Sequence, residues 1–243
     1  MNPTEAFKKE CEERIETQGR NEKLLKASSS FIEETIRSGY SYNFTWMGRP
    51  IIQYPQDMMA MQEIIWDIKP DLIIETGIAH GGSIIYYASL LELIGKGKIL
   101  GIDIDIREHN RVEIEKHPMS KRITMIQGSA IDTDIIEQVK PYAKDQNVVM
   151  VCLDSNHTHA HVLKELELYS QFVTPGSYLI AFDTIVEDLP PNFYEDRPWK
   201  VGDNPKTAVH DFLKNNNDFI IDKKIDNKLL VSVAPDGYLK RIK

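Results

Sequence analysis

Apolar runs of strand length alternate with stretches of helical spacing along the larger, C-terminal part of the chain. Strands are expected near residues 71–75, 98–102, 122–126, 147–153 and 177–182, and helices near 83–94, 108–117, 131–141 and 158–172. This alternation is typical of a parallel sheet with helices on both faces. Two further apolar runs, Phe219–Ile221 and Leu229–Val233, flank a charged stretch and predict a terminal hairpin. The predicted fold class is therefore α/β, with a doubly wound, mainly parallel seven-stranded sheet.

The N-terminal part has a different pattern. Residues 4–38 place apolar side chains among charged ones at roughly helical spacing, which predicts one or two amphipathic helices. An aromatic-rich loop follows over residues 39–55, and a helix is expected from about Gln56 to Trp66. We therefore divide the chain into an N-terminal helical extension, residues 1–45, and one α/β domain, residues 46–243. The extension either covers this domain or makes a subunit contact, which leaves a homo-oligomer open.

The first strand of the α/β domain runs into an acidic residue and a glycine turn. Gly77 allows a sharp turn at positive φ, and two later glycines remove side chains where a ligand would approach the backbone. A dinucleotide site would have G-x-G-x-x-G here, whereas this chain has E-T-G-x-x-x-G-G-S. The carboxylate would repel a phosphate and attract a cation, which favours S-adenosylmethionine, although an ordinary strand-to-helix connection is the alternative. The candidate cofactor residues are Glu75, Thr76, Gly77, Gly81, Gly82 and Ser83.

The second strand also ends in an acidic residue. Asp103 follows Glu75 by about one β-α unit, where nucleotide-binding sheets place an acid for the ribose hydroxyls. Asp105 would point the same way if the strand continued. Alternatively, both aspartates begin a loop and cap the next helix, a position that favours aspartate.

The fourth and fifth strands end in a second set of polar residues. Asp154 and His157 follow the fourth strand, and Asp183 follows the fifth. Ligands of open parallel sheets bind beyond the carboxyl ends of the strands, so these residues are expected in one cleft. Asp154 and Asp183 would repel each other unless a hard cation such as Mg²⁺ lay between them. His157 has a near-neutral pKa that suits a general base, but an ordinary loop histidine is the alternative.

The histidines at positions 157, 159 and 161 also raise the possibility of a zinc site. His157 and His161 would share one face of a helix. The H-E-x-x-H pattern, however, lacks its glutamate. Zinc is therefore disfavoured.

Composition narrows the classes of partner and compartment. Acidic residues outnumber basic ones by 37 to 29, which disfavours a nucleic-acid groove and favours a small-molecule substrate. The two cysteines, Cys11 and Cys152, form neither a disulfide framework nor a zinc spacing. No apolar run has membrane-spanning length, and residues 1–16 lack a signal-like apolar region. A cytoplasmic protein without a membrane partner is expected.

Several ordered motifs resemble the cephalosporin hydroxylase family. Four are residues 75–83, 101–107, 153–157 and 176–184. Further similar segments are residues 46–50, 54–57, 204–209 and 235–241, so that the resemblance covers roughly residues 40–243. The family has the Rossmann-like class I S-adenosylmethionine-dependent methyltransferase fold, and its relatives include rhamnosyl and macrolide-sugar O-methyltransferases.

The resemblance implies a role for each matching residue. Glu75, Gly77 and Ser83 match the cofactor turn, and Asp103 matches the ribose acid. The resemblance also places Ser129 and Ala130 beside the adenine, Asp154 and Asp183 at a metal, and His157 as a candidate base. One departure concerns the metal, because relatives similar to the macrolide-sugar enzymes have Glu-Asp where this chain has Phe182-Asp183. Glu187 or Asp188 would replace the missing carboxylate only if the following loop folded back.

The favoured interpretation is an O-methyltransferase that acts on a hydroxyl of a sugar or glycosylated small molecule, with S-adenosylmethionine and a divalent metal, Mg²⁺. Asp154 would bind the metal and contact the cofactor, and it is the alternative base to His157. The loop of residues 188–204 would either close over a sugar ring or form an ordinary surface loop. A hydroxylase or oxidoreductase, as the family name suggests, and a non-catalytic cofactor-binding subunit are the competing hypotheses.

Overall fold

A computed structural model describes residues 2–243 of the chain. The α-helices are α1 (Pro3–Gly19), α2 (Glu22–Arg37), α3 (Pro55–Ile68), α4 (Gly82–Ile94), α5 (Glu108–Lys116), α6 (Thr133–Ala143), α7 (His159–Tyr169), α8 (Pro205–Asn215) and α9 (Lys223–Leu229). The strands are β1 (Thr45–Trp46), β2 (Arg49–Pro50), β3 (Leu72–Thr76), β4 (Lys98–Asp103), β5 (Ile123–Gln127), β6 (Val149–Leu153), β7 (Tyr178–Ala181), β8 (Phe219–Ile221) and β9 (Tyr238–Arg241). Short 3-10 helices are η1 (Tyr40–Asn43), η2 (Pro118–Arg122), η3 (Ser170–Phe172) and η4 (Thr184–Asp188).

The main sheet has seven strands in the order β5-β4-β3-β6-β7-β9-β8. The strands from β5 to β7 are parallel, and β9 is antiparallel to both of its neighbours. This arrangement confirms the predicted α/β class with a mainly parallel seven-stranded sheet. The direction in which successive strands are added reverses between β3 and β6, and the carboxyl ends of strands at such a switch point form a ligand-binding crevice.

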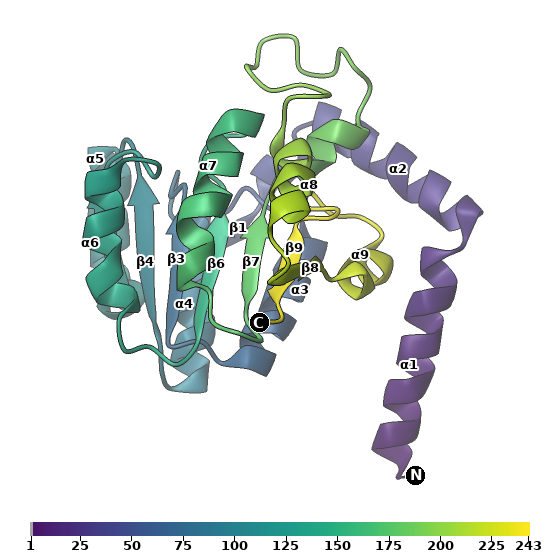
Figure 1. Cartoon of the computed structure of the whole chain (residues 1–243), viewed down its shortest axis with the longest axis horizontal. Helices are drawn as coiled ribbons and strands as arrows, with labels where there is room; N and C mark the ends of the chain where they lie inside the picture. The colour runs from purple at the N-terminus through teal and green to yellow at the C-terminus, as the bar shows by residue number, and fades with distance from the viewer. Residues whose placement is uncertain (1) are drawn as a thin grey trace.

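Helices cover both faces of this sheet (Figure 1). On one face, α3 and α4 pack with the side chain of Ile73 of β3. On the other face, α6, α7 and α8 pack with Leu72 and Ile74 of the same strand. Because both faces of the central strands are buried, their sequences are continuous apolar runs rather than alternating patterns.

The predicted C-terminal hairpin is wrong in its second strand. The structure confirms a strand at Phe219–Ile221, but the returning strand is β9, and Leu229–Val233 is not a strand. Asp222 starts helix α9 instead of a turn, because its carboxylate accepts a hydrogen bond from the Lys224 amide at 3.2 Å. The Val233 amide donates to Asp57 at 2.9 Å and is therefore not available to a strand ladder.

The two N-terminal helices differ in their burial. Helix α1 buries no side chain and projects from the body of the molecule (Figure 1), where it lies against α9 through an ion pair of 2.7 Å between Glu12 and Lys224. Helix α2 buries Ile32, and its Thr35 hydroxyl lies 2.7 Å from the hydroxyl of Tyr54 in the core. Within residues 2–243, no helix is both long and apolar enough to cross a membrane.

Candidate active site

The glycine turn after β3 is built so that only glycine fits at its closest contacts. Gly77 has a φ of 93°, and a Cβ there would lie 2.1 Å from the carbonyl oxygen of Asp154. A Cβ at Gly82 would lie 2.1 Å from the carbonyl oxygen of Pro50. Gly81 has a φ of 82° as the N-cap residue of α4. The turn therefore brings β6, the segment after β2 and the start of α4 into direct contact.

Glu75 lies beneath this turn and is fully buried. Its Oε2 accepts a hydrogen bond from the Ser83 hydroxyl at 2.8 Å, whereas Oε1 has no partner among the described residues. Burial raises the pKa of Glu75 to about 8, although the hydrogen bond from Ser83 and the nearby Tyr87 hydroxyl oppose the increase. A buried oxygen without a donor is unfavourable, so the turn suits a cationic ligand.

Asp103 holds the shape of the turn. Its Oδ2 accepts hydrogen bonds from the amides of Ile78 at 2.7 Å and Ala79 at 3.1 Å, and its Oδ1 accepts one from the Asp105 amide at 3.0 Å. A carboxylate can accept about four hydrogen bonds, so capacity for a ribose hydroxyl remains. The ribose role of Asp103 stays a prediction. Asp105 is exposed and forms an ion pair of 3.8 Å with Arg107.

The remaining cofactor candidates occupy two other places. Thr76 ends β3 and is fully buried, with a hydroxyl that has no partner among the described residues. Ser129 and Ala130 lie in the turn after β5, where the Ala130 carbonyl accepts a hydrogen bond from the Tyr169 hydroxyl at 2.9 Å. The adenine role of this turn stays a prediction.

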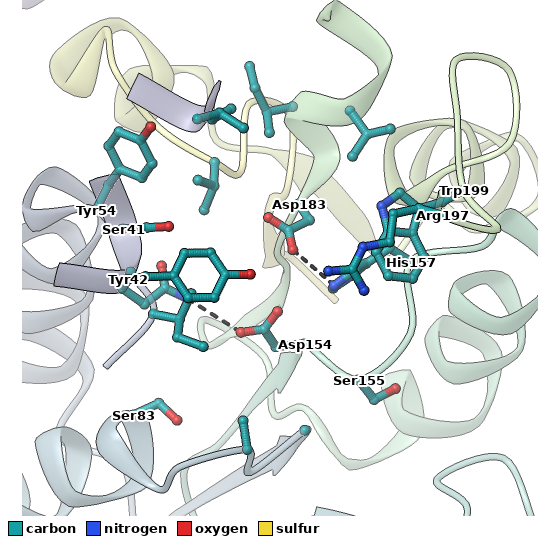
Figure 2. A pocket seen from close by; sticks show the side chains of 18 of the residues that line it. Ser41, Tyr42, Tyr54, Ser83, Asp154, Ser155, His157, Asp183, Arg197 and Trp199 are labelled. Carbon is teal, nitrogen blue, oxygen red and sulfur yellow. Dashed lines mark hydrogen bonds and ion pairs between the residues drawn. The ribbon is translucent and has the colours of Figure 1, made fainter. Parts of the chain in front are cut away.

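Asp154, His157 and Asp183 converge from the ends of β6 and β7 (Figure 2). Each offers one ligand atom within 4.8 Å of the other two, and His157 Nε2 lies 3.0 Å from Asp183 Oδ2. Burial and the neighbouring charge of Asp183 raise the pKa of Asp154 well above its usual value. Burial lowers the pKa of His157, but Asp183 outweighs it and raises this pKa to about 9. Two carboxylates and an imidazole at this spacing fit a divalent cation.

The structure shows where the other candidate metal ligands lie, namely the two acidic residues after Asp183 and the histidines near His157. Glu187 Oε2 accepts a hydrogen bond from the Gly202 amide at 2.8 Å, and Asp188 forms an ion pair of 2.6 Å with Lys206 of α8. Neither carboxylate therefore replaces the missing metal ligand. The third potential ligand is His157, which the sequence suggested only as a base. His159 and His161 contact Thr207 and Ser155 respectively, so the three histidines do not converge on a zinc site.

One cavity of about 580 Å³ joins the glycine turn to this cluster, within the range of about 300–1,000 Å³ that ligand sites occupy. Tyr42 and Trp199 lie on opposite sides of the two aspartates (Figure 2). The Trp199 ring is perpendicular to that of His157, with 4.6 Å between centroids. Phe193 of the same loop stacks under Arg37 of α2 at 4.4 Å. The loop therefore forms a wall of the cavity. Lining residues from both halves include Gly77, Gly82, Ser83, Asp154, His157, Asp183, Tyr194 and Arg197.

Sequence reasoning missed Gln53 in this cavity. Its side chain is only 6% exposed, and its Nε2 lies 3.5 Å from Asp154 Oδ2. The available signal was an amide side chain between Ile52 and Tyr54, in an apolar segment just before a proline-initiated helix. A buried amide requires hydrogen-bond partners, so its presence in such a segment indicates a polar site.

Comparisons with known proteins identify the family of this chain. Residues 38–242 match the model of the family described as Rhamnosyl O-methyltransferase/CmcI. The rhamnosyl O-methyltransferase of Mycobacterium tuberculosis is 28% identical over 231 residues, which cover 90% of this chain and 88% of that protein. The enzyme of the same description from Mycobacterium leprae is 28% identical over 220 residues, with coverages of 86% and 90%.

Solved structures show the same fold. CmcI in a Mg-SAM form superimposes with a TM-score of 0.60 at 20% identity, over 83% of this chain and 78% of that one. An O-methyltransferase from Bacillus cereus in complex with SAH gives a TM-score of 0.51 at 16% identity, with coverages of 79% and 81%. The fold is thus that of class I S-adenosylmethionine-dependent methyltransferases.

Proposed function

Because this chain belongs to the Rhamnosyl O-methyltransferase/CmcI family, we propose that it transfers a methyl group from S-adenosylmethionine to a hydroxyl of a sugar or glycosylated small molecule. The observation that carries the proposal is the cavity itself. It joins a glycine turn over a buried carboxylate to the Asp154, His157 and Asp183 cluster, between aromatic walls that suit a sugar ring.

We assign the cofactor to the turn that contains Gly77, Gly82 and Ser83. The N-terminus of α4 would attract the cofactor's carboxylate, because unpaired amides and the helix dipole favour an anion there. The unpartnered oxygen of Glu75 favours positive charge nearby. Asp103 keeps the Ile78 and Ala79 amides in place and would offer its free lone pair to a ribose hydroxyl.

We assign the acceptor to the other end of the cavity. Asp154 and Asp183 would hold Mg²⁺, which supplies a Lewis acid that lowers the pKa of a bound hydroxyl. With a pKa of about 9, His157 is largely protonated near neutral pH in the absence of a cation, and the positive charge of Mg²⁺ would lower this pKa. The neutral imidazole would then accept the hydroxyl proton, and Asp183, 3.0 Å from Nε2, would stabilise the imidazolium that results. Tyr42 and Trp199 would orient the sugar ring, so that most of the rate acceleration comes from alignment of the reacting groups.

A turnover assay tests the proposal and separates it from its competitors. The purified chain is incubated with Mg²⁺, S-adenosylmethionine carrying a labelled methyl group, and a panel of rhamnosides and other glycosides, and the products are analysed by mass spectrometry. We expect label in a sugar O-methyl ether and equimolar S-adenosylhomocysteine. Tight cofactor binding without transfer to any glycoside would favour a non-catalytic subunit, and an oxygenated product would favour a hydroxylase.

A further inference from the structure

Gln53 has an unused hydrogen-bonding atom inside the cavity. Its Oε1 is buried and has no partner among the described residues, although the residue lines the same cavity as the glycine turn. Leaving a buried carbonyl oxygen unpaired is unfavourable, because the atom loses its hydrogen bonds with water and gains none in return. A polar atom in this position therefore calls for a donor that arrives with a ligand.

The orientation of the amide follows from its neighbour. The amide group of Gln53 turns its Nε2 donor toward the Oδ2 acceptor of Asp154, at 3.5 Å. Oε1 then points away from the carboxylate. Because Oε1 is an acceptor, the missing partner must be a hydrogen-bond donor.

The backbone places this acceptor beside the glycine turn. The carbonyl oxygen of Pro50 and the Cα of Ile51 lie where a side chain at Gly82 would stand, so the segment that carries Gln53 packs directly on the first turn of α4. Tyr54, fully buried and bonded to Thr35 of α2, fixes the other side of Gln53. The segment that carries Gln53 is thus packed against the first turn of α4, and the amide of Gln53 reaches Asp154.

The proposed function limits the donors that reach this point. If the carboxylate of the cofactor lies at the N-terminus of α4, its α-ammonium is attached to the adjacent carbon and must also find acceptors within a few bonds. An uncharged amide oxygen can accept from an ammonium without adding a further negative charge beside Asp154 and Asp183. We infer that Gln53 is a cofactor-binding residue whose Oε1 accepts a hydrogen bond from the α-ammonium group of S-adenosylmethionine.

The inference rests on the proposed function and is tested by binding rather than turnover. Calorimetry compares S-adenosylhomocysteine with its deaminated analogue, which lacks only the ammonium, on the wild-type chain and on Gln53→Met. Met matches Gln in length and flexibility but offers no amide oxygen. Gln56→Met is the matched control, since Gln56 also has a buried unpartnered Oε1 but does not line the cavity.

We expect Gln53→Met to weaken binding of S-adenosylhomocysteine roughly ten- to hundred-fold, the range for a hydrogen bond to a charged group, and to leave binding of the deaminated analogue unchanged. Gln56→Met should change neither affinity. Equal losses for both ligands would overturn the inference, because Gln53 would then act only through Asp154, and so would an unchanged affinity for S-adenosylhomocysteine.

Two further controls keep the outcome decisive. Thermal unfolding without ligand shows whether Gln53→Met remains folded, and Gln53→Ala, which cannot overpack the site, replaces it if it does not. A wild-type chain that binds no S-adenosylhomocysteine would reject the proposed function and this inference together. A wild-type chain that binds both ligands, with no selective loss in either Gln53 variant, would reject this inference alone.

Discussion

Asp57 and Asp154 are two aspartates with raised pKa values in very different surroundings. Asp57 is fully buried and accepts hydrogen bonds from the Ser232 hydroxyl at 2.5 Å, the Val233 amide at 2.9 Å and the Tyr238 hydroxyl at 2.8 Å. Asp154 is partly buried, and within residues 2–243 its carboxylate is paired only with the Gln53 amide at 3.5 Å. The fold thus supplies three hydrogen-bond donors to the Asp57 carboxylate, whereas the Asp154 carboxylate retains acceptor capacity for a ligand.

This difference separates a structural carboxylate from a functional one. Burial raises the pKa of Asp57 to about 6, and its three donors limit the increase. Asp57 ties the start of α3 to the segment before β9, which explains why that segment is not a strand. Asp154 has Asp183 nearby, and repulsion adds to the effect of burial. A carboxylate of this second kind is stabilised by a ligand or cation rather than by the fold.

The largest expected effect is on the rate of methyl transfer when His157, the neighbour of Asp154, is replaced. If His157 accepts the hydroxyl proton, His157→Ala should lower the chemical step about a hundred- to ten-thousand-fold, while affinity for S-adenosylhomocysteine stays near that of the wild type. Single-turnover kinetics and calorimetry measure the two quantities. His161→Ala is a matched control and should retain turnover. Near-normal turnover in His157→Ala would make Asp154 the preferred base.

Exchanging each aspartate for alanine tests the comparison directly. Asp57→Ala leaves three buried donors without an acceptor and should lower the free energy of unfolding by roughly 2–5 kcal/mol. Asp154→Ala removes a repulsive charge and should change this free energy by less than about 1 kcal/mol when a chelator keeps metal away. Urea unfolding measures both values. Similar losses in the two variants would show that Asp154 is a structural residue as well.

The pH dependence of the free energy of unfolding should reveal the raised pKa of Asp57. Its folded pKa of about 6 lies above the usual value, so its contribution to stability is full below about pH 4 and is lost as the pH rises through about 6. The two-unit difference corresponds to roughly 3 kcal/mol. Urea unfolding across this window should show the loss in the wild-type chain relative to Asp57→Asn, which cannot ionise. Parallel curves for the two proteins would contradict the assignment.

The smallest expected effect is the increase in thermal stability when Mg²⁺ binds. With a dissociation constant of about 1 mM, about 10 mM Mg²⁺ would stabilise the folded chain by roughly 1.4 kcal/mol, and the melting temperature would rise by a few degrees. Asp154→Asn should lose this shift, whereas Asp188→Asn, which alters an ion pair with Lys206 outside the metal cluster, should keep it. An equal shift in both variants would indicate nonspecific salt stabilisation, and Asp154 and Asp183 would then serve as hydrogen-bond acceptors.

Local sequence patterns determined most of the fold. Continuous apolar runs such as Val149–Leu153 indicated strands buried on both faces, and the glycines at 77, 81 and 82 indicated the turn that the structure contains. The topology rule for parallel sheets then predicted that Asp154 and Asp183 would meet, because their strands are neighbours. These features depend on nearby residues or on general rules of strand order, so one sequence is sufficient to predict them.

Contacts between distant segments decided the rest. Leu229–Val233 has the composition of a strand, but the Asp57 carboxylate, 176 positions away in sequence from Val233, takes the amide that a strand ladder would need. Gln53 belongs to the site only because Gly82 admits the backbone of Pro50 against α4. His157 became a potential third ligand when β7 brought Asp183 within 3.0 Å. Hydrogen-bond partners and charges at such sites are set by three-dimensional packing, which the spacing of residues along one chain does not encode.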